Sequence, residues 1–182
     1  MRVWLLTPLL LVAALAAGCG EDQEQPQALP SVAVTTATTA PSPTSAPVPT
    51  EAQAETPQGA AAFARFFYAE VQRAFAEKDP VIVERLSAPD CETCDLFVNS
   101  LTKLRDNNES ASSVRYDIKA AESPAVEGDK VIVTVLYDGP AVQRFDAAGA
   151  VISEEPAVVD AQEQMVLVRG AEGWLVSEIQ AV

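Results

Sequence analysis

The stretch Lys130-Val-Ile-Val-Thr-Val-Leu-Tyr137 is the part of the sequence that decides the fold class. It consists mostly of β-branched and aromatic residues, which favour pleated strands. Turn residues bound it on both sides, with Glu127-Gly128-Asp129 before it and Asp138-Gly139-Pro140 after it. The stretch is therefore predicted to be one strand of an antiparallel sheet with tight connections.

Both faces of this predicted strand are largely apolar. Successive side chains of a strand point to opposite faces, so one face carries Val131, Val133, Val135 and Tyr137. The other face carries Ile132, Thr134 and Leu136. A strand that is apolar on both faces is expected to be covered on both. We expect helices of this chain on the first face, and a second copy or another protein on the second.

Further short segments with the apolar pattern of a strand lie on either side of this one, separated by turns that contain glycine or proline. The further predicted strands are Ser113–Ala121, Ala141–Asp146, Ala150–Ser153, Val158–Arg169 and Trp174–Ile179. Ala141–Asp146 is expected to pair with Ala150–Ser153 across Ala147-Ala148-Gly149. The C-terminal part of the chain is thus predicted to be a run of antiparallel strands.

Upstream of these strands the apolar spacing changes from two residues to four, which is typical of a helix. One face of this long helix carries Phe63, Phe67, Val71 and Phe75. Thr56-Pro57 supplies a capping hydroxyl followed by proline at the first helical position. Asp79-Pro80 ends the helix near Lys78, because proline restricts the residue before it. Two shorter helices are predicted over Val81–Ser87 and Cys91–Asn107.

Helices followed by antiparallel strands predict one α+β domain over residues 57–182, with the helices packed on a curved antiparallel sheet. This order of elements, with the closing strand Gly173-Trp-Leu-Val-Ser-Glu-Ile179, resembles the nuclear-transport-factor-two-like cone, also called ketosteroid-isomerase-like. Two motifs, Thr56-Pro-Gln-Gly-Ala-Ala61 and Ser87-Ala-Pro-Asp-Cys-Glu-Thr-Cys94, are similar to those of an uncharacterised family of actinobacterial lipoproteins. The resemblance implies an anchor, a tether and a cone-like domain of no assigned activity.

Residues 1–18 are predicted to be a lipoprotein signal peptide. One positive charge precedes the apolar run Val3–Ala17, which is too short for a spanning helix of about 20 residues. Leu15-Ala-Ala-Gly-Cys19 resembles the lipobox, which implies cleavage before Cys19 and acylation of its thiol with diacylglycerol and palmitate. The chain is then expected at the outer face of the cell membrane, held there by this lipid. The alternative is a secreted protein cut near Ala16–Gly18.

Residues 19–56 are predicted to be the anchored cysteine followed by a disordered, acidic tether. After Cys19 the stretch is rich in Pro, Thr, Ala, Ser, Gln and Glu, and it contains no aromatic residue, Lys or Arg. Such a segment cannot bury enough apolar area to offset the entropy of ordering it. Its Ser, Thr and Pro content is also typical of glycosylated stalks.

Cys91-Glu-Thr-Cys94 is the motif with intrinsic chemistry, and it has three interpretations. A thiol–disulfide catalyst is disfavoured because three carboxylates, Asp90, Glu92 and Asp95, oppose a thiolate. Two cysteines are half of a zinc ligand set, and the chain has no histidine. We therefore predict a structural disulfide between Cys91 and Cys94, as expected outside the cytoplasm, with a redox role as the alternative.

The lack of histidine also removes the commonest general base and the Ser-His and Cys-His nucleophile pairs. Cone-fold enzymes can use a carboxylate in an apolar pocket together with tyrosine. Carboxylates in or beside predicted strands are Asp117, Asp138 and Asp160. The tyrosines are Tyr68, Tyr116 and Tyr137. No spacing brings these side chains together, so we predict no catalytic residue, cofactor or metal site, and a protein that is not an enzyme.

The net charge of the chain limits which classes of binding partner are possible. The chain carries 12 Lys and Arg against 26 Asp and Glu, a net charge of −14. Nucleic-acid binding depends on clustered basic residues and is therefore excluded. Direct docking on an anionic membrane surface is also unfavourable, because the negatively charged chain would be repelled by it.

The predicted function is non-enzymatic binding, most directly of another envelope protein or a second copy through the outward face of the sheet. Phe63, Phe67 and Trp174 are predicted either to fill the core or to line a cavity between helix and sheet. Binding of a small apolar ligand in that cavity is the first alternative, and a thiol redox or cone-fold enzyme is the second.

Overall fold

The computed structural model describes residues 46–182. The predicted signal peptide, Cys19 and the first part of the predicted tether lie outside the described residues. Among the described residues, no helix has both the length and the apolar character needed to cross a membrane.

The helices are α1 Thr50–Gln53, α2 Pro57–Glu77, α3 Val81–Glu84 and α4 Glu92–Asp106. Three of the helices, α2 to α4, form where the sequence predicts them, whereas α1 lies in the stretch predicted to be tether. The Thr56 hydroxyl caps α2 by accepting a hydrogen bond of 3.0 Å from the backbone N–H of Gly59. Lys78 ends α2 in the left-handed conformation, with φ of 55°. The predicted start and end of the long helix are thus confirmed, and α3 is shorter than predicted.

The strands form one large and one small antiparallel sheet. The large sheet has the order β2 Asp117–Glu122, β4 Lys130–Gly139, β7 Val158–Gly170 and β8 Gly173–Ala181, with β3 Val126–Glu127 beside β4. The small sheet has the order β1 Ser110–Ala111, β5 Val142–Phe145 and β6 Val151–Glu155. The predicted hairpin of residues 141–146 with 150–153 is confirmed in β5 and β6. The strand predicted to begin at Ser113 begins at Asp117 instead.

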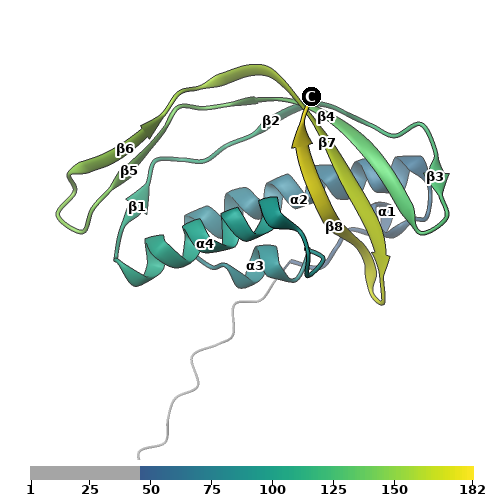
Figure 1. The fold of residues 1–182 in the computed structure, drawn as a ribbon, viewed down its shortest axis with the longest axis horizontal. Coiled ribbons are helices and arrows are strands. Elements are labelled where there is room, and N and C mark those ends of the chain that lie inside the picture. The colour runs from purple at the N-terminus through teal and green to yellow at the C-terminus, as the bar shows by residue number, and fades with distance from the viewer. Residues whose placement is uncertain (1–45) are drawn as a thin grey trace, which may run out of the picture. The chain divides into compact units, whose positions relative to one another are not determined.

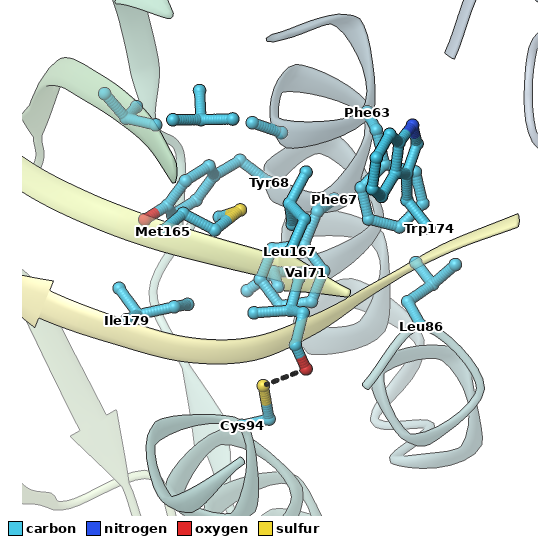
Figure 2. Close-up of a cluster of buried hydrophobic side chains, with 14 of the residues drawn as sticks. Phe63, Phe67, Tyr68, Val71, Leu86, Cys94, Met165, Leu167, Trp174 and Ile179 are labelled. Atoms are coloured by element: carbon cyan, nitrogen blue, oxygen red, sulfur yellow. Dashed lines mark hydrogen bonds between the residues drawn. The ribbon is translucent and has the colours of Figure 1, made fainter. Parts of the chain in front are cut away.

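The helices cover one face of the large sheet, as the sequence predicts. Helix α2 packs against β2 and β4, and α4 packs against β8 (Figure 1). The residues of β4 predicted to face the helices are 0–8% exposed: Val131, Val133, Val135 and Tyr137. Figure 2 shows the core that results, in which Phe67 and Val71 of α2 lie near Leu167 of β7. The predicted cone-like α+β fold, with helices on an antiparallel sheet, is confirmed.

Residues 46–56 differ from the sequence prediction, because they pack on the folded domain and do not continue a disordered tether. Ala52 in α1 is buried, and the indole N–H of Trp174 donates to the carbonyl of Ala54 at 3.0 Å. Arg85 donates to the carbonyl of Ala46 at 2.9 Å. The chain can approach α2 here because Gly59 has no Cβ, which would lie 2.1 Å from the Ala54 oxygen. The predicted boundary at residue 56 therefore lies inside the folded part.

Candidate functional site

The three tyrosines of the chain meet between α2 and the sheet, although they lie far apart in the sequence. Tyr68 comes from α2, Tyr116 from the segment just before β2, and Tyr137 from β4. The centroid of the Tyr68 ring lies 5.0 Å from that of Tyr116 and 5.8 Å from that of Tyr137. The rings of Tyr116 and Tyr137 are 5.4 Å apart, edge to face. Aromatic pairs at these separations stabilise one another beyond their buried area.

The carboxylate at the centre of this cluster is Glu163 of β7. The hydroxyl of Tyr137 donates to Glu163 Oε1 at 2.7 Å, and the hydroxyl of Tyr68 donates to Oε2. Burial, followed by the negative charge of Glu163, raises the pKa of Tyr116 to about 12. Burial is also the main cause that raises the pKa of Tyr68 and Tyr137, and Glu163 raises both further. The phenols of Tyr68 and Tyr137 therefore act as neutral hydrogen-bond donors to Glu163, and the phenol of Tyr116 also stays neutral at physiological pH.

The aspartates that the sequence offered as partners for these phenols lie elsewhere. Asp138 and Asp160 each form an ion pair with Lys119, whose Nζ lies 2.7 Å from an Oδ1 atom of either residue. The Lys119 hydrogen bond lowers the pKa of Asp138, which also accepts the backbone N–H of Asp160 at 2.8 Å. Asp117 is exposed and stands opposite Asp138 in the sheet register. These groups form a surface ion pair network and not an acid–base site.

Sequence reasoning missed Glu163, although the signal was present. Glu163 precedes Met165 and Leu167 by two and four residues, and both of these side chains are fully buried. The period of two along β7 therefore assigns Glu163 to the face that the helices cover. A carboxylate on a core-facing position needs hydrogen-bond partners, and the tyrosines supply them.

Cys91 and Cys94 lie at bonding distance, with their sulfur atoms 1.98 Å apart. Both residues are buried, and Cys91 caps α4 by accepting the backbone N–H of Cys94 on its sulfur at 3.2 Å. Figure 2 shows Cys94 directed at the Val176 carbonyl of β8. The segment before the pair also bonds to this strand, because Val176 donates to Leu86 at 2.9 Å and accepts from Ala88 at 2.7 Å. The disulfide geometry fits a structural link across the first turn of α4, and the backbone hydrogen bonds attach the segment before it to β8.

We predict that replacing both Cys91 and Cys94 by alanine lowers the free energy of unfolding by about 2 kcal/mol and keeps the fold. A closed loop this short gives the low end of the ~2–4 kcal/mol that disulfides contribute. Urea unfolding measures the change, and circular dichroism checks the fold. Thiol labelling of the native protein without reductant should modify neither cysteine. Ready labelling of both, together with reduction of insulin by the protein, would favour the redox alternative.

Phe63 and Phe67 lie in the core and are 0% exposed. Trp174 is 2% exposed, and the guanidinium of Arg169 lies 4.5 Å from its ring centroid. Trp174 also borders a surface hollow of about 330 Å³ beside the turn Gly170–Gly173. Of the two sequence interpretations of these residues, the structure places both phenylalanines in the packed core.

The outward face of the large sheet carries two neighbouring hollows, which we call the outer hollows. One has a volume of about 850 Å³ and lies between the Ala88–Thr93 segment and the outward side chains of β7 and β8. The other, of about 320 Å³, lies beside Pro124 and Ile132. Lys130 and Val166 border both. In residues 46–182 no group of three or more His, Cys, Asp or Glu side chains is placed to hold a metal ion.

The fold and these sites define a cone-like α+β protein with a partly buried phenol–carboxylate cluster and an outer face of mixed apolar and charged residues. Residues 32–180 match the model of a family of unknown function, DUF6318, and the chain belongs to this family. No curated protein matches the chain.

Several solved structures are similar to this chain. The intermembrane space region of the chloroplast protein ARC6 has a TM-score of 0.50 at 9% identity, covering 69% of this chain and 95% of that one. The protein Aln2 from a Streptomyces species has a TM-score of 0.41 at 15% identity, covering 65% of this chain and 85% of that one. A likeness at such low identity concerns the fold alone.

Proposed function

We propose that this chain is a lipid-anchored, extracytoplasmic binding protein whose domain docks another envelope protein on the outward face of its sheet. The observation that carries the proposal is the exposed apolar surface of that face. Ile132 is 48% exposed, whereas its neighbours Val131 and Val133 are 2% and 0% exposed. Val166, Val168 and Leu175 border the larger outer hollow beside it. Apolar side chains that remain partly exposed and are rimmed by polar residues are typical of interaction sites on soluble domains.

The charges around the outer hollows suit a basic partner. Four carboxylates border the hollows, against two basic side chains, Lys130 and Arg169; the carboxylates are Asp90, Glu92, Glu127 and Glu178. None of them takes part in the ion pairs found within residues 46–182. A second copy would place like charges against each other, which disfavours a homodimer through this face. The partner we propose therefore presents apolar side chains surrounded by Lys and Arg.

The N-terminal sequence supports the proposed location outside the cytoplasm, anchored to the membrane by lipid. Leu15-Ala-Ala-Gly-Cys19 resembles a lipobox, and the segment after it contains no basic residue before Arg65. An acidic segment is repelled by anionic lipid. This repulsion would favour positions of the domain away from the membrane surface, where a partner can reach the outer hollows.

The hydrogen bonding and protonation of Glu163 and the three tyrosines favour a binding function over a catalytic one. Glu163 already accepts hydrogen bonds from two phenols. The phenols hold their protons far above neutral pH, which makes them poor general bases. The cluster is therefore better suited to hold its geometry than to transfer protons.

We predict that Thr134→Lys weakens docking of the envelope partner at least tenfold without unfolding the domain. Thr134 lies on the outward face of β4 between Ile132 and Leu136, so a lysine there adds a charge to the apolar surface and repels a basic partner. Full-length protein, crosslinked in membranes of the producing cells, identifies the partner, and sedimentation with that purified partner measures the affinity.

The control is Asn99→Lys, which adds the same charge at an exposed position of α4. It should bind as the unmodified chain does. Equal weakening by both variants would point to bulk charge, and full binding by Thr134→Lys would contradict docking on this face.

A further inference from the structure

A small pocket opens where the long strands of the hairpin bend between the two sheets, and we call it the bend pocket. The chain passes from β4 to β5 through Gly139-Pro140-Ala141, and from β6 to β7 through Pro156-Ala157 (Figure 1). The pocket has a volume of about 180 Å³. Its apolar walls are Val114, Pro140, Val142, Pro156 and Val158. The volume of the pocket is below the roughly 300 Å³ at which drug-sized sites begin, so the pocket suits a head group or a very small molecule.

The aromatic wall of the bend pocket consists of Tyr116 and Tyr137. Tyr116 is half-buried, and its ring packs edge to face on that of Tyr137. The faces of tyrosine rings carry partial negative charge and attract cations within about 6 Å of the ring centroid. These rings therefore offer a surface for a positively charged group.

The charged groups that act on this pocket are acidic. Glu155 at the end of β6 lines it directly, and Glu163 lies behind Tyr137, whose hydroxyl it accepts at 2.7 Å. The negative charges of both carboxylates act on the Tyr116 phenol and, after burial, contribute to raising its pKa. Neither carboxylate forms an ion pair in the part of the chain that the structure describes.

Two basic side chains on neighbouring strands pair with other carboxylates, whereas Arg115, between the lining residues Val114 and Tyr116, is exposed and forms no ion pair within residues 46–182. Arg144 of β5 pairs with Glu109, and Lys119 of β2 pairs with Asp138 and Asp160. Arg65 of α2 donates to the Ile118 carbonyl at 3.2 Å. The negative field at the bend pocket thus has no dedicated counter-ion within residues 46–182, and a ligand cation would supply one.

We propose that the bend pocket binds a small organic cation, an alkylated ammonium group held between the tyrosine faces and the Glu155 carboxylate. The apolar walls match the methyl groups of such a cation, and the carboxylates match its charge. An anion is disfavoured by the two carboxylates, and a neutral apolar ligand would gain nothing from the charge of Glu155, which is exposed at the rim of the pocket. This site lies apart from the outer hollows, so it is independent of the proposed docking of a protein.

The test compares choline with 3,3-dimethylbutan-1-ol, which has the same shape with a neutral carbon in place of the nitrogen. Each is titrated into the full chain in an uncharged detergent, and ligand-observed NMR measures saturation. We expect saturable choline binding at least tenfold tighter than that of the neutral alcohol. Equal binding of the two would overturn the proposal in favour of an apolar site, and so would the absence of saturable choline binding at 100-fold excess.

Two variants locate the site. Glu155→Gln is expected to weaken choline binding at least threefold, and Tyr116→Leu at least fivefold, because each removes one wall of the proposed site. Glu154→Gln is the matched control, since it removes the same charge from the adjacent residue, which bonds to Gln143 at 2.5 Å and does not line the pocket. Equal losses with Glu154→Gln and Glu155→Gln would show non-specific attraction and overturn the assignment. Melting curves check that each variant is folded.

Discussion

Phe67→Ala is expected to lower the free energy of unfolding by about 3–5 kcal/mol, the largest stability change we predict for a single side chain. Phe67 is 0% exposed and points from the middle of α2 into the core beside Leu167 of β7. Removing a buried phenyl group loses its transfer free energy and leaves a cavity that the neighbours fill only in part. Since domains are stable by about 5–15 kcal/mol, the variant should approach the limit of folding. Urea unfolding measures the difference.

Phe66 provides the matched control for this prediction. It has the same side chain, one position earlier on the same helix, but it is only partly buried. Phe66→Ala should therefore cost less than half as much as Phe67→Ala, because water already reaches part of its ring. If the two variants lost equal stability, the orientation of α2 on the sheet would be wrong.

Cys19→Ala is expected to abolish attachment to the membrane through lipid. Each buried methylene of an acyl chain contributes about 0.8 kcal/mol, so two long chains supply on the order of 20 kcal/mol. No spanning helix among residues 46–182 could replace that attachment. The variant should appear in the medium or remain as uncleaved precursor, whereas the unmodified chain should pellet with membranes. Fractionation followed by immunoblotting measures the distribution.

Mass spectrometry of the mature N-terminus makes this prediction sharper. The mature chain should begin at residue 19 and carry the added mass of acyl groups. Gln23→Ala, a change just beyond the processing site, is the control and should leave both the acylation and the location unchanged. An unmodified N-terminus at another residue would contradict the anchor and support the secreted alternative.

The sequence predicted the elements of the fold well, because their signals are local. The alternation in Lys130–Tyr137 identified which side chains face the helices, and their burial confirms it. The capping signal at Thr56-Pro57 and the interruption at Asp79-Pro80 identified α2. Periods of two and of 3.6 residues follow from backbone geometry, so a short window is enough to read them.

Composition was a poorer guide at the start of the domain. Residues 46–56 read as tether because their average composition is polar and lacks aromatic residues. Their order depends on a few particular contacts, among them the Trp174 indole bonded to Ala54 and the space left by Gly59. An average over a segment cannot show a partner that lies 120 residues away.

By itself, then, the sequence determined the α+β class, the strand faces, the long helix and the cysteine pair, all of which depend on spacings within a few residues. Only in the folded chain do the rings of Tyr68, Tyr116 and Tyr137 meet, with Glu163 accepting from the first and the third, and only there does the bend pocket open beside them. Those positions meet through the register of β4 with β7 and the packing of α2 on β2 and β4. Side chains brought together by long-range pairing have no fixed spacing along the chain, so a pattern within the sequence does not show which of them will touch.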